Sequence, residues 1–209
     1  RAINVELIPK LVTSLLELGL FVSLISTNSV FGGERPSPNE DDPHDPQIPN
    51  AIQKNEAEGA LWDVAQKLNA TDRLNIVRLT KILDSETSPL PSWYDAWKNN
   101  KSIEPFSDLI FAPISVQFAG EALATIGEKR VAGNLHLSGA ENISYVAFAE
   151  AIAKKMEVNP ALLAPTTATA KGVNLVFKPT YSCLGMKRTS ELTGIQPQTL
   201  SAVVDDLLV

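Results

Sequence analysis

The 209-residue sequence contains one cysteine, Cys183, which excludes an internal disulfide framework and a cysteine-based zinc site. It has no block of lysine or arginine residues, and its formal net charge is -6. Nucleic acids and anionic membranes select clustered positive charge, so neither is an expected partner. A small polyanionic ligand remains compatible, because helix N-termini and backbone amides can bind it.

Long hydrophobic runs are also missing. The most apolar early stretch, residues 11–25, contains Glu17 and Gly19, and it is better interpreted as a helix end followed by a strand than as a membrane span. No targeting peptide is recognisable. The single cysteine fits a reducing compartment, so a cytoplasmic location is the expectation. With 44% hydrophobic residues, the chain can bury a core in one large domain or in a domain plus a small lobe.

A third absence concerns glycine. No Gly-x-x-Gly-x-x-Gly pattern, the turn that begins a dinucleotide-binding Rossmann unit, occurs anywhere in the sequence. The chain opens at Arg1, without an initiator methionine and already close to a predicted helix. Two interpretations stay open: the sequence is a fragment, or the protein has no such turn.

The patterns that are present alternate between strand and helix. Apolar residues at helical spacing predict a helix over 3–18, with Pro9 either kinking it or beginning it. A strand is predicted over 21–26, a helix over 51–69 and a second strand over 75–79. Later segments predict further elements: helices over 92–98, 119–126, from Ser144 to about Met156 and over 199–208, and strands over 109–116 and 133–137. The alternation predicts an α/β fold.

The most informative segment follows the first predicted strand. The apolar run Phe21–Ile25 gives way to Ser26-Thr27-Asn28-Ser29-Val30-Phe31-Gly32-Gly33. A buried strand that delivers polar groups to a sheet edge is where an α/β protein builds a site. A polar loop without periodicity continues to Pro49, and Pro49-Asn50-Ala51-Ile52-Gln53-Lys54 then begins the next helix.

These two segments resemble the active-site half of an extended short-chain dehydrogenase/reductase, in the dTDP-4-dehydrorhamnose reductase and NAD-dependent nucleotide-sugar epimerase branch. The similarity continues in the family's order through 111–116, 133–139, 143–149 and 186–195, so it covers nearly the whole chain. It implies a partial Rossmann-like parallel sheet with a small C-terminal substrate lobe. Residues 1–80 would form the C-terminal part of a dinucleotide-binding domain, and residues 81–209 a mixed region with returning sheet elements and the substrate-binding lobe.

The resemblance also implies ligands. The cofactor would be NAD or NADP, although its binding turn, within about 70 to 90 residues of βαβαβ, is not in this sequence. The small-molecule partner would be a nucleotide sugar, and a homodimer is compatible with the family. No metal is implied. His136 is interpreted as a structural imidazole, and His44, beside Asp42 and Asp45, as part of a solvated loop rather than a weak metal contact.

In the reductases, a tyrosine phenol protonates the sugar carbonyl oxygen as hydride arrives, a lysine four residues later lowers that phenol's pKa and holds the cofactor ribose, and a serine or threonine hydroxyl binds the same oxygen. Positions i and i+4 share a helix face, which brings ammonium and phenol together. When the family's pattern is placed on this sequence, Thr27 matches the hydroxyl residue and Lys54 matches the lysine. Glu58 matches an acidic residue that is common one helical turn later. Asn50 replaces the tyrosine, and an amide has no proton to give at neutral pH.

The resemblance therefore assigns catalytic positions to Thr27, Asn50 and Lys54 and cofactor contacts to Ser26, Thr27 and Lys54. It assigns substrate contacts to Asn28, Ser29 and Phe31. The function it implies is an NAD(P)-dependent nucleotide-sugar reductase or epimerase relative that acts on or binds a 4-keto sugar nucleotide. Because of Asn50, whether the protein is an enzyme stays open. The alternative is a non-catalytic regulatory or binding homologue, similar to the regulatory subunit of methionine adenosyltransferase.

Two simpler interpretations compete with these assignments. A literal Tyr-x-x-x-Lys occurs at Tyr94-Asp95-Ala96-Trp97-Lys98, beyond the second predicted strand, and we interpret it as a short amphipathic helix with Trp93 and Trp97 packed inward. Lys54 could instead form an ordinary surface ion pair with Glu58, four residues on.

Overall fold

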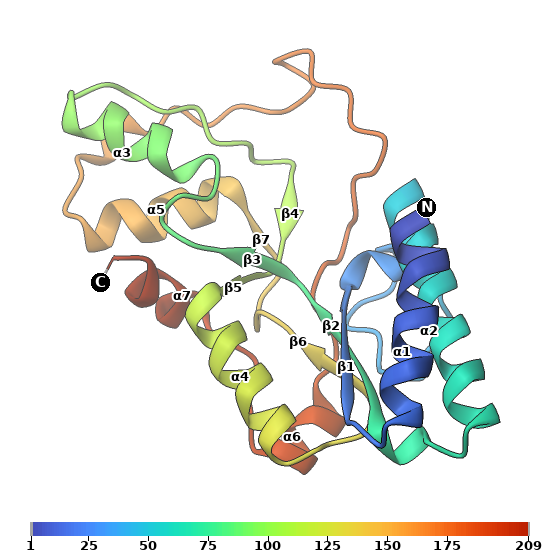
Figure 1. The fold of residues 1–209 in the computed structure, drawn as a ribbon. Helices are drawn as coiled ribbons and strands as arrows, with labels where there is room; N and C mark the ends of the chain where they lie inside the picture. The colour runs from blue at the N-terminus through green and yellow to red at the C-terminus, as the bar shows by residue number, and fades with distance from the viewer. Residues whose placement is uncertain (1, 209) are drawn as a thin grey trace.

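A three-stranded parallel sheet forms the centre of the fold in the computed structural model, which describes residues 2–208. Its strand order is β1-β2-β6, with bounds Val22–Thr27, Leu74–Leu79 and Gly133–Leu137 (Figure 1). Thr27 of β1 lies level with Leu79 of β2, and Leu79 with Leu137 of β6. All three strands therefore end at the same edge of the sheet, which is where parallel sheets present ligand sites.

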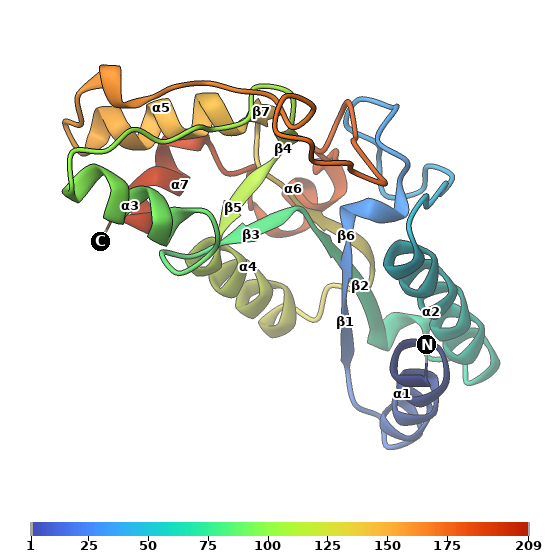
Figure 2. The ribbon, with the colours of Figure 1, turned by 90° about the horizontal axis from the view of Figure 1, so that it is seen from above.

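Two helices cover one face of this sheet. They are α1 (Ile8–Glu17), preceded by the π-helical turn η1 (Ala2–Leu7), and α2 (Pro49–Lys67), which lie together in Figure 2. Pro9 lies in the first turn of α1. It therefore begins the α-helix rather than kinking it, and its missing N–H costs no hydrogen bond there. The buried side chains between this pair and the sheet are Val12, Leu16, Leu24, Leu61, Ala65, Leu74 and Ile76.

The opposite face is covered by α4 (Val116–Glu128), and α6 (Lys187–Thr193) lies against β6 (Figure 2). The core on this side contains Val77, Leu79, Ala119, Ala122, Ile126, Leu135, Leu137 and Met186. Alternate residues of β2 thus enter two different cores, as the pleat of a strand requires. The α/β class predicted from the alternating pattern is confirmed, with β2 buried along its whole length.

Apart from the clusters on the two faces of the sheet, a second core lies among α3 (Leu90–Lys98), α5 (Tyr145–Lys155) and α7 (Leu200–Leu207). The Ser144 side chain caps α5 by accepting a hydrogen bond from the backbone N–H of Ala147, as predicted. Trp93 and Trp97 are buried in this core, which confirms the inward packing predicted for the α3 segment. The short helices η2 (Asn28–Val30), η3 (Thr71–Arg73) and η4 (Pro160–Leu162) complete the helical elements of the described residues.

Two short strand pairs connect the sheet with this second core. β3 (Lys81–Leu83) pairs in parallel with β5 (Pro113–Ser115), and β4 (Ile110–Phe111) pairs antiparallel with β7 (Ile143–Ser144). The prediction of one strand over 109–116 is therefore wrong: the chain breaks at Ala112 and serves two different partners. Pro113 has no N–H to continue a ladder, which suits the first position of a new strand.

Two long segments lack regular structure. Residues 31–48 join η2 to α2, and residues 167–186, which we call the strap, run from the second core back across the sheet (orange in Figure 1). The first was predicted as a polar loop, yet it buries the side chains of Pro38 and Glu40. Within residues 2–208, none of the helices combines the length and hydropathy needed to cross a bilayer.

Candidate functional site

An open cavity of about 380 Å³ lies where β1 and β2 end. One wall is the polar segment that sequence analysis singled out, and the other is formed by the start of β3 and by the strap. The lining residues are Ile25, Ser26, Thr27, Asn28, Ser29, Leu79, Thr80, Lys81, Ile82, Ala112, Phe177, Pro179 and Ser182. We call this cavity the cleft.

The tip of β1 presents hydroxyl and amide groups to the cleft. Thr27 Oγ1 accepts a hydrogen bond from the backbone N–H of Ser29 at 3.2 Å and lies 3.1 Å from Ser29 Oγ. This capping contact turns the chain into η2 and holds the two hydroxyls side by side. The Asn28 amide donates to the carbonyl oxygen of Ser182 at 3.0 Å, so the strap is attached directly to the β1 tip.

Lys54 reaches the same strand from α2. Its ammonium donates to the carbonyl oxygen of Ile25 at 2.8 Å, and Ile25 itself lines the cleft two residues before Thr27. Lys54 is thus attached to the strand that carries Thr27, although it is not among the residues that line the cleft. Asn50 is exposed in the first turn of α2, four residues before Lys54. The catalytic and cofactor-binding roles assigned to these residues stay predictions.

Glu58 does not form the surface pair with Lys54 that was considered as an alternative. Its side chain is buried, accepts a hydrogen bond from the Ser26 hydroxyl, and forms an ion pair with Arg78 of β2 at 2.8 Å. The Ser26 hydroxyl, predicted to contact a cofactor, thus has a carboxylate partner on the α2 side of the sheet. Both side chains of the pair are buried away from water, so each charge has to offset the cost of burying the other.

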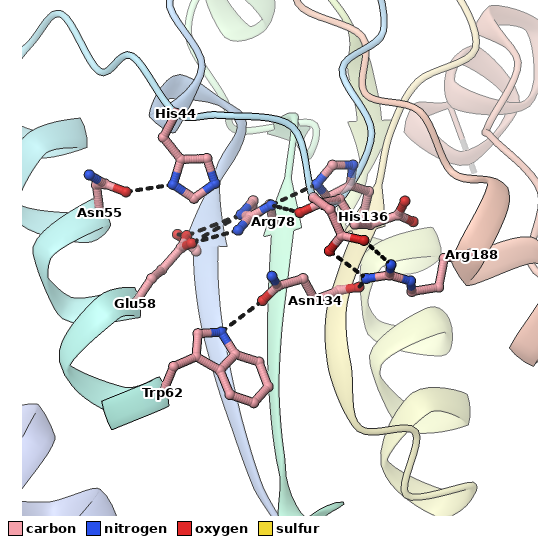
Figure 3. A network of polar contacts seen from close by, with 11 residues as sticks. His44, Asn55, Glu58, Trp62, Arg78, Asn134, His136 and Arg188 are labelled. Carbon is pink, nitrogen blue, oxygen red and sulfur yellow. Dashed lines mark hydrogen bonds and ion pairs between the residues drawn. The ribbon is translucent and has the colours of Figure 1, made fainter. Parts of the chain in front are cut away.

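Arg78 continues the network beyond Glu58 (Figure 3). Its guanidinium donates to the backbone carbonyl oxygen of Glu40 at 2.9 Å, and Nη1 lies 3.2 Å from Nε2 of His136. His136 Nδ1 lies 2.8 Å from the carbonyl oxygen of Gly185. One buried guanidinium therefore connects α2, the segment 31–48 and, through His136, the C-terminal end of the strap.

Burial, together with the nearby Arg78 charge, lowers the pKa of His136 to about 3. The imidazole is therefore neutral at physiological pH and has one N–H. Donation from Nδ1 to Gly185 leaves Nε2 as the acceptor for Arg78, which satisfies both ring nitrogens. The structural role predicted for His136 agrees with this geometry.

Phe31, predicted to contact the substrate, is buried beside the network rather than on the cleft wall. Its ring packs edge-on against His44 and His136, and the Arg78 guanidinium lies 5.4 Å from its centre. It does line a much smaller pocket, of about 20 Å³, that adjoins the cleft and shares Asn28 and Ser29 with it. His44 also contacts Asn55 through Nδ1, at 2.5 Å, so it is attached to α2 rather than simply solvated.

The strap makes a close backbone contact with Gly33 beside the small pocket. The N–H of Tyr181 donates to the carbonyl oxygen of Gly33 at 2.8 Å. Gly33 has a φ of +79°, and a Cβ there would lie 2.4 Å from Cβ of Pro179. Only glycine allows both the backbone conformation and the approach of the strap.

Several residues of this region were missed by sequence analysis: Arg78, Lys81, Phe177, Pro179 and Ser182. Arg78 had a recognisable signal, a lone charge inside an apolar strand. Lys81 follows the end of the same strand. The three strap residues had none, because their place depends on a contact with a segment about 150 positions earlier in the chain.

The remaining candidates lie elsewhere. Tyr94 is on α3, packed against the second core, and its hydroxyl is buried without a hydrogen-bond partner among the described residues. Burial raises the pKa of the Tyr94 phenol. Residues 2–208 contain no cluster of three or more His, Cys, Asp or Glu side chains that could hold a metal ion.

Comparisons with known proteins agree with this architecture. The model of a family described as "RmlD substrate binding domain" matches residues 1–209. No curated protein sequence matches the chain. Among solved structures, a dTDP-4-dehydrorhamnose reductase from Bacillus anthracis, in complex with NADP, superposes with a TM-score of 0.79 at 19% identity, covering 96% of this chain and 69% of the other.

Two further structures are similar. A dTDP-glucose 4,6-dehydratase from Bacillus anthracis, in complex with NAD, gives a TM-score of 0.77 at 12% identity over 95% of this chain and 64% of the other. MoeE5, in complex with UDP-glucuronic acid and NAD, gives 0.74 at 17% identity over 98% of this chain and 69% of the other. The chain thus spans about two thirds of the length of these structures, and at such identities the likeness establishes the fold.

Proposed function

Because the chain belongs to the RmlD substrate binding domain family, we propose that its cleft binds a nucleotide sugar and that the protein is an NAD(P)-dependent nucleotide-sugar reductase or epimerase relative acting on a 4-keto sugar. The observation that carries this proposal is the attachment of Lys54 to the strand whose tip carries Thr27. The hydroxyl lines the cleft at the tip of β1, and the ammonium binds the backbone of the same strand two residues earlier.

The roles follow from the chemistry of each group. The Thr27 hydroxyl can donate to a sugar carbonyl oxygen, with the Ser29 hydroxyl 3.1 Å away as a second polar contact. Asn28 and the hydroxyl groups beside it would bind the sugar. The Asn50 amide can hydrogen-bond a carbonyl or a ribose hydroxyl but cannot protonate an alkoxide. The site therefore has less capacity for proton transfer than it would have with a tyrosine at this position.

NAD or NADP, when bound, would supply or accept the hydride. The residues present fit the nicotinamide end of such a cofactor in part. Lys54 is positioned by Ile25 and carries two further donor hydrogens, which suits a ribose hydroxyl, and Ile25 offers partly exposed apolar surface in the cleft. The Ser26 hydroxyl already donates to the Glu58 carboxylate, so it would contact the cofactor in addition to that bond. The glycine-rich turn for the pyrophosphate is not among these residues.

The second candidate function is a non-catalytic binding or regulatory homologue, and Asn50 is the observation that favours it. The two candidates share the cleft and differ in the proton donor. In the binding homologue, the Arg78 network and the strap contacts would maintain a shape for a ligand or partner, with no chemical step.

The test uses the full chain and three measurements. NADH and NADPH fluorescence titrations show whether a cofactor binds, and nucleotide-sugar titrations show whether the cleft is used. Turnover of a 4-keto sugar nucleotide is then compared between the wild type and Asn50→Tyr, with Ile52→Tyr as the matched control, because Ile52 is exposed on the same helix.

Wild-type turnover would support the reductase. A wild type that binds but is inactive, together with activity gained only in Asn50→Tyr, would support the binding homologue. If neither a cofactor nor a nucleotide sugar binds, the proposed function is rejected.

A homodimer is part of the proposal. Ile3, Leu7 and Leu11 are 67%, 58% and 55% exposed and recur every four residues along η1 and α1. Such a stripe of apolar side chains suits a helix of a second copy. Light scattering should give twice the chain mass for the wild type and the single mass for Leu7→Glu/Leu11→Glu. A monomeric wild type would contradict the dimer. The cytoplasmic location stays a prediction.

A further inference from the structure

Lys81 has an unusual position in the cleft. It is the first residue of β3, its side chain is exposed, and it lines the cavity opposite the polar segment of β1. Of the described residues that line the cleft, Lys81 is the one with a charged side chain. The others contribute hydroxyls, one amide and apolar groups, and the nearby Lys54 ammonium is bound to the carbonyl oxygen of Ile25.

No protein group neutralises the Lys81 ammonium. Among residues 2–208, Lys81 has no ion pair and no side-chain hydrogen bond, whereas the strap lysines Lys171 and Lys178 pair with Glu104 and Asp108. No acidic side chain of the described part of the chain lines the cleft. The buried Glu58 carboxylate, which binds the lining residue Ser26, is already compensated by Arg78. An unpaired cation in a concave site raises the local concentration of anions.

The register of the sheet places Lys81 near the reactive end of the cleft. Thr27 pairs with Leu79, and Lys81 follows Leu79 by two residues, just beyond the edge where β1 and β2 end. A ligand group bound by Thr27 and Ser29 on one side would therefore have the Lys81 side chain on the other. A flexible four-carbon stem with three donors can adapt to several anion geometries.

We infer that Lys81 recognises an anionic group of the ligand, either a carboxylate on the sugar or a phosphate of the nucleotide, and so determines which nucleotide sugars the cleft accepts. This inference rests on the proposed function for its ligand class. It assigns a role to a residue outside the Thr27, Asn50 and Lys54 set, and it specifies the charge of the ligand at a defined place in the cleft.

The experiment compares two probes that differ in one group. UDP-glucuronic acid and UDP-glucose share the diphosphate, but only the first has a carboxylate on the sugar. Each is titrated calorimetrically into the full-chain wild type, Lys81→Met and Lys81→Arg. The matched control is Lys98→Met, which removes an exposed lysine at the end of α3, outside the residues that line the cleft.

Lys81→Met should weaken binding at least about tenfold, as expected for loss of a charge-assisted contact, while Lys81→Arg and Lys98→Met stay within about twofold of the wild type. A loss for UDP-glucuronic acid alone would identify the sugar carboxylate, and a loss for both probes would identify a phosphate. If Lys81→Met binds both probes as tightly as Lys98→Met does, the inference is overturned.

Failure of the proposed function is detected separately. For this test the lysines are labelled by reductive methylation with ¹³C and observed by NMR. The Lys81 signal is assigned from its loss in Lys81→Met. Sodium glucuronate and sodium pyrophosphate are then added. If the wild type binds neither nucleotide sugar, the proposed function fails. In that case a Lys81 signal that shifts more than that of Lys98 still supports anion recognition, and a signal that does not move overturns it.

Discussion

Glu58 and Arg78 face each other across the α2 side of the sheet, with Arg78 Nη2 and Nε lying 2.8 and 3.1 Å from the same carboxylate oxygen of Glu58. Their side chains are 3% and 1% exposed. Arg78 also donates to the carbonyl oxygen of Glu40, in the segment 31–48, and lies 3.2 Å from Nε2 of His136, on β6. The pair therefore connects the helix of Lys54 with the segment 31–48 and, through His136, with the C-terminal end of the strap.

Replacing Arg78 with Met should lower the free energy of unfolding by about 3 to 5 kcal/mol, because the Glu58 carboxylate would remain buried without compensation. The double variant Glu58→Leu/Arg78→Met should recover part of this loss, since it removes both charges. Urea denaturation measures all three proteins.

The exposed pair of Arg35 and Asp42 provides the control for this prediction. Its atoms lie 3.7 Å apart and both side chains reach solvent, so Arg35→Met should cost less than about 1 kcal/mol. An Arg78→Met variant as stable as Arg35→Met would show that the buried pair contributes no more than a surface one.

Stability should depend on pH through His136. Its pKa is about 3 in the fold and about 6.5 in an unfolded chain, so the unfolded state binds the proton more readily. The stabilisation from the neutral imidazole is complete above pH 6.5 and is lost as the pH falls towards 3. Relative to His136→Gln, which does not titrate, the wild type should lose up to about 1.4 kcal/mol per pH unit between pH 6 and 4.

The measurement for His136 is the difference between the two unfolding free energies at each pH, which cancels the carboxylates common to both proteins. Parallel curves for the wild type and His136→Gln over this interval would mean that the imidazole takes up its proton without unfolding.

Cys183 should react slowly with thiol reagents. Its side chain is buried, and burial raises the pKa of the thiol to about 11, so very little thiolate is present at neutral pH. We expect modification by a chromogenic disulfide at least about a hundredfold slower in the folded protein than in urea. Comparable rates in the two states would indicate that the strap opens readily beside Leu184 and Ser182.

Gly33→Ala tests the contact between the segment 31–48 and the strap. The new Cβ would lie 2.4 Å from Pro179 Cβ and 2.9 Å from its Cα, in addition to the cost of a positive φ. Gly172→Ala is the matched control, because Gly172 has a φ of +68° with nothing within 4 Å of a Cβ. Gly33→Ala should therefore be destabilised by at least about 1 kcal/mol more than Gly172→Ala and should bind nucleotide sugars more weakly.

Equal unfolding free energies for the two glycine variants, measured in urea, would indicate that the strap moves aside without cost. In that case the hydrogen bond between Tyr181 and Gly33 would not contribute to holding the strap in place.

The sequence was sufficient for the parts of the site that depend on local pattern. The end of β1 at Thr27 follows from the change from apolar to hydroxyl residues, and the helix that begins near Pro49 and Asn50 follows from periodicity and from a proline in its first turn. Their relative placement, with Lys54 reaching Ile25, follows from the right-handed connection between neighbouring parallel strands.

Other parts depend on contacts between distant segments and were not predictable in this way. A surface pair of Glu58 with Lys54 was kept as an alternative, because residues four apart are neighbours on a helix. The structure instead pairs Glu58 with Arg78, twenty residues away on another strand. The segment 109–116 was predicted as one strand because residue pattern does not reveal that Ile110 and Pro113 pair with different partners.

The hydrogen bond from Asn28 to Ser182 joins residues that are 154 positions apart. During synthesis, the sheet strands β1, β2 and β6 leave the ribosome well before the strap does. A nascent chain that ends before residue 167 would therefore contain β1, β2 and β6 but would lack the part of the cleft wall that the strap forms. The walls of the cleft would come together only after the strap has been synthesised and Asn28 has bound the carbonyl oxygen of Ser182.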